Sequence, residues 1–158
     1  MKEKLQEKLK LLSAADSPYF CGSSCLLSLY DVLCEIELNT VDFEKAFPHL
    51  KENVLKLFDE DPRLFELSKK KEAFFEEEWK EAINILYDYA SWLEDMNQLI
   101  ALVRDAGLKQ HVEKLRMDVD FLVAILKETL VIFENREDLP PEFARAENEV
   151  LTNIRKGA

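Results

Sequence analysis

The chain has 158 residues, and 32 acidic residues against 21 basic ones give it a formal net charge of −11. Hydrophobic residues make up 47% of the sequence, which is enough for a core and excludes an intrinsically disordered chain. Three glycines are too few for the many turns of a β-sandwich or barrel. The acidic balance argues against DNA binding, because phosphate recognition needs clustered basic side chains.

The N-terminal segment is predicted to form an amphipathic helix over about residues 2–13. Leu5, Leu9 and Leu12 share one face, and charges of both signs break the apolar run that a secretory signal requires. No window approaches the roughly 18 apolar residues of a membrane span. Three cysteines are too few for a disulfide framework. We therefore expect a cytoplasmic protein with no membrane partner, and the abundance of glutamate and lysine favours a thermophilic source.

Further short helices are expected before the middle of the chain. One covers about residues 23–37 and is apolar on most sides, which is typical of a helix at the centre of a core. The next begins near residue 39, with a kink or restart at Pro48. Asp61 and Pro62 form a helix start signal, because aspartate caps a helix and proline fits its first turn. We expect that helix to continue to about Arg104, with a bend or break at the lysines of 69–71.

The second half of the chain carries two heptad seams, in which apolar residues recur at steps of four and three. The first seam comprises Phe75, Trp79, Ala82, Leu86, Tyr89, Leu93, Met96, Ile100 and Val103, and the second comprises Leu108, Val112, Leu115, Val119, Leu122, Leu126, Leu130 and Phe133. Gly107 between them suits the left-handed position at a helix end. The short turn predicts an antiparallel, coiled-coil-like hairpin with arms of about residues 72–104 and 108–136. A last helix is expected over about residues 141–156.

The whole sequence predicts one all-α domain over residues 1–158, a bundle of five to six helices built on this hairpin. Each arm would be about 45 Å long at 1.5 Å per residue, which is longer than a domain of this size, so part of its apolar surface would be left for another chain. Apolar residues off the seams support this view: Ile83, Tyr87, Trp92, Leu99, Val123, Ile125 and Val131. We expect a homo-oligomer, such as a homodimer, or a complex with a protein partner, and the interface residues would be Tyr87, Trp92, Leu99 and Val123.

Three cysteines are the first candidates for chemistry. Cys21 and Cys25 share a helix face, so they could form a disulfide or bind a soft metal, with Cys34 further along the chain. Zinc sites usually have four ligands, often in two closely spaced pairs, and the second pair is missing here. Cysteine is also among the most buried residue types, so packed core thiols are the favoured interpretation. The sequence leaves open whether Cys21 and Cys25 form a disulfide or are free thiols.

An acidic cluster is the second candidate. Glu77, Glu78 and Glu81 satisfy the pattern E-E-x-x-E, which resembles the first half of the magnesium site of the all-α nucleotide pyrophosphohydrolases. Carboxylates at i, i+1 and i+4 can gather divalent cations that bridge substrate phosphates. The resemblance implies a magnesium-dependent nucleotide hydrolase. Asp88 or Asp95 would then replace the E-x-x-D motif that the family carries on a second helix and that this sequence lacks. The alternative is a solvated helix face.

A third candidate is a pair of residues near the hairpin turn. Arg104 and His111 are separated by six residues, and the pair resembles the arginine–histidine pair of HEPN-type helical ribonucleases. In that family the two residues lie on helices that meet at a dimer interface, whereas Gly107 separates them here. The alternative is a surface histidine beside a hairpin turn.

The sequence contains no complete catalytic constellation, because it has no glycine-rich phosphate loop and no Glu-x-x-His pair for a di-iron centre. We therefore expect a non-catalytic interaction or assembly factor, such as an adaptor, a chaperone or a complex subunit, that attracts a basic protein client by charge. Such a protein needs no cofactor, and magnesium belongs only to the hydrolase alternative. A second alternative is a helical subunit of an RNA-associated complex, for which Lys69, Lys70 and Lys71 are the only dense basic run.

Overall fold

The computed structural model describes residues 21–38 and 45–157, and regular structure in these ranges is entirely helical. The helices are α2 (Cys21–Leu38), α3 (Leu50–Lys69), α4 (Glu76–Asp105), α5 (Lys109–Glu134) and α6 (Pro141–Lys156). The all-α class is therefore confirmed. The helix predicted over residues 2–13 lies outside the described residues. Among the helices that the structure does describe, none combines the length and the apolar character that crossing a membrane requires.

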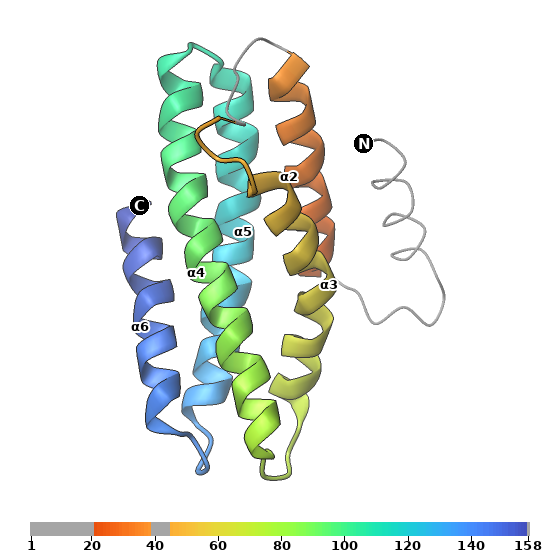
Figure 1. Cartoon of the computed structure of the whole chain (residues 1–158), viewed down its shortest axis with the longest axis vertical. Helices are drawn as coiled ribbons and strands as arrows, with labels where there is room; N and C mark the ends of the chain where they lie inside the picture. Colours follow the sequence, from red (N-terminus) through yellow and green to blue (C-terminus); the bar gives the residue numbers. More distant parts are fainter. Residues whose placement is uncertain (1–20, 39–44, 158) are drawn as a thin grey trace, which may run out of the picture.

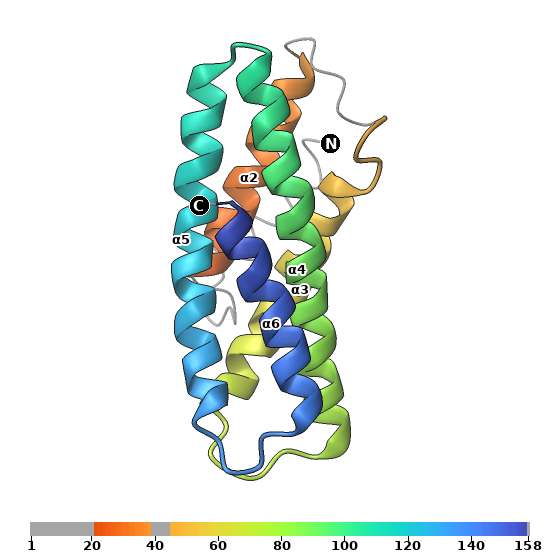
Figure 2. The ribbon, with the colours of Figure 1, turned by 90° about the vertical axis from the view of Figure 1, so that its left-hand side faces the viewer.

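A pair of long helices, α4 and α5, forms the middle layer of the bundle (Figure 1). They contain 30 and 26 residues, so they span about 45 and 39 Å at 1.5 Å per residue. α2 and α3 lie along one side of this pair and α6 along the other, as the second view also shows (Figure 2). α2 lies near the α4–α5 turn, whereas α6 lies toward the opposite end. The shorter helices thus cover different halves of the long pair.

The ends of α4 and α5 are close to the predicted arms of the hairpin. Gly107 has a φ of 80° in the turn between them, the left-handed conformation that glycine adopts without steric cost. Every residue of the first seam from Trp79 to Val103 is buried, whereas Phe75 at the start of the seam is 70% exposed. Burial along the seam agrees with the predicted inner face of the helix. Coiled-coil packing between the two seams stays a prediction.

The predicted helix start at Asp61 and Pro62 is wrong, because both residues lie inside α3, which ends at Lys69. A proline inside a helix loses one backbone hydrogen bond and crowds the preceding turn. Packing between helices outweighs that cost here, since Asp61 is buried and accepts a 2.6 Å hydrogen bond from the Tyr89 hydroxyl on α4. The break between α3 and α4 falls in the loop of residues 70–75, which begins within the run of lysines where a bend or break is predicted, so that prediction is confirmed.

The helix expected from residue 39 onward is only partly described. α3 begins at Leu50, two residues after Pro48, and the structure describes the chain again from residue 45. Pro48 therefore precedes the helix instead of kinking it, which agrees with the predicted restart and with the poor fit of proline in a helix interior. The start of the predicted segment, residues 39–44, lies outside the described residues.

An aromatic cluster closes the core at the end of the bundle opposite the α4–α5 turn. Phe74, Trp79, Phe133 and Phe143 come from the α3–α4 loop, α4, α5 and α6, and their neighbouring ring centroids are 4.6–6.1 Å apart. Tilted and edge-on arrangements of this kind add to the gain from apolar burial. The cluster therefore joins four separate segments of the chain.

Arg136 ties the two loops beside this cluster together. Its guanidinium lies 3.8 Å from the centre of the Phe74 ring and donates hydrogen bonds to the backbone carbonyls of Lys70 and Glu72. It also donates a 3.0 Å hydrogen bond to Asp138 in its own loop. A planar group with five donors suits this combination of stacking and several acceptors. The α3–α4 and α5–α6 loops are thus held as one unit.

Candidate functional site

The acidic motif lies at the start of α4 and faces basic residues of α3 and the following loop. Arg63 Nε donates a 2.6 Å hydrogen bond to Glu81 Oε2, and Arg63 Nη2 lies 3.7 Å from Glu78 Oε2. Lys70 Nζ donates a 2.6 Å hydrogen bond to Glu78 Oε1, which also accepts the Phe75 backbone N–H at 2.9 Å. The Lys70 hydrogen bond, followed by that from Phe75, lowers the pKa of Glu78. Two of the three carboxylates are therefore paired with cations of the chain itself.

The remaining residues of the magnesium hypothesis are not gathered around these two. Glu77 is exposed, and Asp88 Oδ2 lies 3.3 Å from Lys56 Nζ. Desolvation raises the pKa of Asp95, which lies further along α4. In the part of the chain that the structure describes, no three side chains of His, Cys, Asp or Glu are grouped to hold a metal ion. Magnesium binding by the acidic motif stays a prediction.

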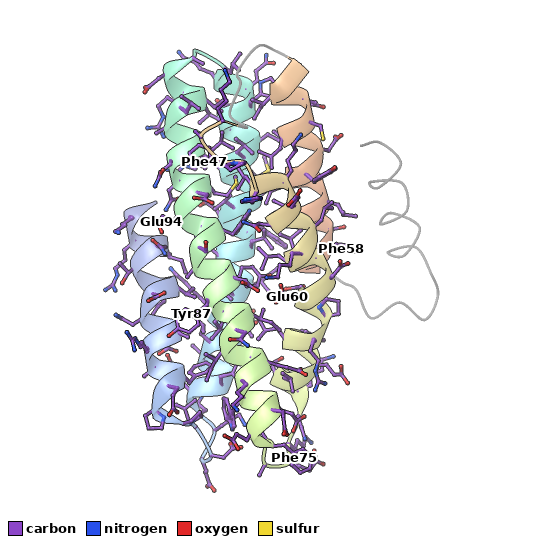
Figure 3. The ribbon with its side chains drawn as sticks, in the orientation of Figure 1. Phe47, Phe58, Glu60, Phe75, Tyr87 and Glu94 are labelled. Atoms are coloured by element: carbon purple, nitrogen blue, oxygen red, sulfur yellow. The ribbon has the colours of Figure 1, made fainter. Side chains whose placement is uncertain are left out.

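Two pairs of carboxyl groups lie between helices. Glu60, labelled on α3 in Figure 3, is hydrogen-bonded to Asp88 on α4, and burial with this contact raises the pKa of Glu60 to about 7. Glu147 on α6 is hydrogen-bonded to Glu134 on α5, and burial with this contact raises its pKa to about 7. One oxygen of each of Glu60 and Glu147 is buried without a donor among the described residues. A shared proton would satisfy each pair, since two adjacent buried carboxylates repel each other.

Two of the predicted interface residues belong to the core of the single chain. Trp92 is 1% exposed and Leu99 is 0% exposed. The reason is that α4 packs against α3 and α6 as well as α5, so it buries more than one seam. Tyr87 and Val123 are half-buried, and Val123 lines a groove beside α6. An interface role for these four residues stays a prediction, and for Trp92 and Leu99 it would require part of the core to open.

The cysteines are placed on α2. Cys25 and Cys34 are half-buried and pack against the core. The side chain of Cys21 lies outside the described residues. Whether Cys21 and Cys25 form a disulfide therefore stays open, and so does a soft-metal role for them.

The Arg104–His111 pair is divided between two helices. Arg104 is exposed near the end of α4, and His111 is half-buried in the first turn of α5. His111 Nε2 lies 3.8 Å from Glu35 Oε2 on α2, so the histidine contributes to the contact between α2 and α5. A catalytic role for the pair stays a prediction.

An apolar stripe on the outer face of α5 was not recognised as a site from the sequence. Met117, Phe121, Val131 and Ile132 are 70%, 48%, 53% and 47% exposed, and Ala124 between them is also exposed. Their helical spacing places all five on one face, and we call them the α5 stripe. The stripe is about 22 Å long at 1.5 Å per residue. α5 forms an edge of the bundle, and no other described helix covers its outer side (Figure 2).

Charged residues lie along one side of the α5 stripe, at Asp120 and Lys127, and within it, at Glu128 between Ala124 and Ile132. Glu113, Lys114, Asp120, Lys127 and Glu128 are all exposed on α5. An apolar centre with a polar rim is the usual anatomy of a protein–protein interface. Of the stripe residues, only Val131 belonged to the off-seam set that the sequence singled out. The others could have been found on a helical wheel, but the sequence alone does not say which outer faces another helix covers.

Comparison of the chain with protein-family models, curated proteins and solved structures found no match in any of the three. The geometry of the chain itself is therefore the basis for a functional interpretation.

Proposed function

We propose that this protein is a non-catalytic interaction or assembly factor, such as an adaptor, a chaperone or a complex subunit, that binds other polypeptides through the α5 stripe. The observation that carries the proposal is the row of four large apolar side chains on one exposed helix face. Single exposed apolar residues are normal on protein surfaces, whereas several on one helix face are typical of a docking surface. Elsewhere among the described residues, only Phe75 and Leu102 are large, apolar and similarly exposed.

The shape and the charge of the surface indicate the kind of partner. A straight apolar row on a helix fits a second amphipathic helix, whose side chains would interdigitate with the stripe at a helix–helix distance of about 8–10 Å. The net charge of −11 favours a client with basic residues around its apolar row. Salt screens such long-range attraction, so binding should weaken at high ionic strength.

Capture of partner proteins by the full chain tests the proposal. The parent chain is compared at low ionic strength with a triple variant, Met117→Lys with Phe121→Lys and Ile132→Lys, and captured proteins are identified by mass spectrometry. Leu102→Lys is the control, because it places one lysine at an exposed apolar site outside the stripe. We expect a defined set of proteins that the triple variant loses and the control retains. Capture of the same proteins by all three chains would contradict the proposal.

Two further proposals concern the source and the cellular location of the protein. The ion pairs among Arg63, Glu66, Lys70, Glu78 and Glu81 support a thermophilic source, because networks of this kind are enriched in thermophilic proteins. The small number of cysteines supports a cytoplasmic location. The magnesium-dependent hydrolase and the RNA-associated subunit remain alternatives, and no specific observation among the described residues favours either.

A further inference from the structure

We infer that the α5 stripe pairs with the α5 stripe of a second copy of this chain, antiparallel and about a two-fold axis near Ala124. The inference rests on the proposed function, because it names an occupant for the same surface. A two-fold dimer uses one patch twice, so that patch must be complementary to itself. Both the apolar and the charged residues of α5 meet this condition.

The apolar residues match in antiparallel register. Met117 and Ile132 lie at equal distances from the midpoint between residues 124 and 125. Antiparallel pairing about that midpoint therefore places Met117 of each copy against Ile132 of the other, with Val131 beside it. Phe121 then faces the aliphatic stem of Glu128. Ala124 lies at the centre, where a small side chain lets two helices approach closely.

The charged residues select the same orientation. Asp120 and Lys127 are exposed and both line the groove beside α6, so they lie on the same side of the stripe. Antiparallel pairing brings residues on the same side together, and it places Asp120 of one copy about 3 Å along the axis from Lys127 of the other, at 1.5 Å per residue. Two symmetric ion pairs result. Parallel pairing about a two-fold axis along the helices would instead place Asp120 and Lys127 of the two copies on opposite sides of the interface, so these ion pairs would not form.

A second copy fits the length of the stripe better than the N-terminal segment does. The predicted row of Leu5, Leu9 and Leu12 would extend over about 10 Å at 1.5 Å per residue, and would cover about half of the stripe. A second α5 covers all of it. One helix pair gives an interface near the lower end of the usual size range, so the dimer should dissociate on dilution.

Sedimentation velocity of the full chain over a dilution series tests the pairing. We expect twice the 18.4 kDa of one chain at high concentration and 18.4 kDa at high dilution. Met117→Lys with Ile132→Lys should give the single-chain mass at every concentration, because the substituted side chains are already exposed in the single chain and the fold should persist. Leu102→Lys should dimerise like the parent. A dimer that the double variant leaves intact would overturn the inference.

The charge register is tested by a swap. Asp120→Lys alone should shift the dimerisation midpoint to higher concentration, and Asp120→Lys with Lys127→Asp should restore it. Failure of the swap to restore dimerisation would overturn the antiparallel register.

A parent chain that is monomeric at every concentration would overturn the pairing itself, and resistance of Met117 to peroxide in that monomer would indicate that residues 1–20 cover the stripe. Client capture is scored separately: its loss with a persistent dimer contradicts only client binding, and a monomer that still captures clients contradicts only the pairing.

Discussion

The hydroxyl of Tyr89 on α4 donates a 2.6 Å hydrogen bond to Oδ1 of Asp61 on α3, in the interior of the bundle. Both side chains are buried. A carboxylate taken out of water needs donors to offset its desolvation. Burial, followed by the charge of Asp61, raises the pKa of Tyr89 well above its ordinary value, so the hydroxyl keeps its proton. This bond helps to fix α3 against α4 beside Pro62, where the sequence predicts a helix start.

Removal of the Tyr89 hydroxyl should destabilise the fold. Tyr89→Phe deletes the donor but keeps the ring, and we expect the free energy of unfolding to fall by about 1–3 kcal/mol because a buried carboxylate loses a hydrogen bond. Urea denaturation measures the change. Tyr87→Phe is the matched control on a half-buried tyrosine of the same helix, and it should change stability by less. Equal losses in the free energy of unfolding for the two substitutions would show that the hydrogen bond to Asp61 does not stabilise the fold.

Raising the pH should destabilise the fold between pH 4.5 and about 7. The pKa values of Glu60 and Glu147 are raised from 4.5 to about 7 in the folded chain. The folded chain therefore binds more protons than the unfolded chain in this range, and the free energy of unfolding falls as pH rises. The stabilising contribution is complete below pH 4.5 and is lost as the pH passes about 7. Urea denaturation at a series of pH values measures the slope.

A double variant separates the effect of Glu60 and Glu147 on the pH dependence from that of the other acidic residues. Glu60→Gln with Glu147→Gln removes both titrations, while the large excess of other acidic residues remains. Its stability should fall less steeply with pH than that of the parent. Parallel curves for the two chains would refute the assignment of the slope to the carboxyl pairs.

Arg136 should be essential for the joined loops at the end of the bundle. Arg136→Met removes the hydrogen bonds to two backbone carbonyls and to Asp138, and we expect a loss of about 3 kcal/mol in the free energy of unfolding. Arg136→Lys should not restore it, because an ammonium group lacks the planar fork and its stacking on Phe74. Arg155→Met is the control, since Arg155 is exposed. Full stability of Arg136→Lys would count against the stacked geometry.

Magnesium with nucleotides should leave the thermal stability of the chain unchanged. The reason is that Glu78 and Glu81 are already paired with Lys70 and Arg63. The hydrolase alternative predicts the opposite: a ligand at 100 times its dissociation constant stabilises the folded state by about 2.7 kcal/mol. Thermal melting with magnesium and a panel of nucleotides distinguishes the two. A shift that Glu78→Gln abolishes would favour the hydrolase.

The bundle was predictable from the sequence because helical periodicity depends on local spacing. Gly107 and Pro141 mark helix ends through their own backbone preferences, and the structure places both where these preferences predict. Pro62 shows where local rules fail. Asp61 and Pro62 favour a helix start by their local preferences. The contact between Asp61 and Tyr89 joins residues 28 positions apart, however, and favours a continuous α3.

The functional surface was harder to predict, for a related reason. Trp92 and Leu99 lie off the seam, so they would be left for a partner if α4 packed only against α5. α4 has three neighbouring helices in the bundle, so these side chains are core. Conversely, Met117 and Phe121 are exposed because α2, α3 and α4 pack against the inner side of α5 and leave its outer face open. Which face of a helix is covered depends on the packing of the whole chain. The apolar periodicity of a single helix does not show which of its faces the other helices cover.

Photo-crosslinking from the centre of the stripe shows directly whether the α5 stripe binds another polypeptide. Phe121 is replaced by p-benzoylphenylalanine in the full chain, with the same replacement at Phe75 as the control because Phe75 is exposed at the end of the bundle (Figure 3). If the α5 stripe is a protein-binding surface, position 121 crosslinks to another polypeptide, either a second copy through its α5 or a client, and position 75 does not. Crosslinks from position 121 only to residues of its own chain, or none at all, would show that the α5 stripe is not a protein-binding surface.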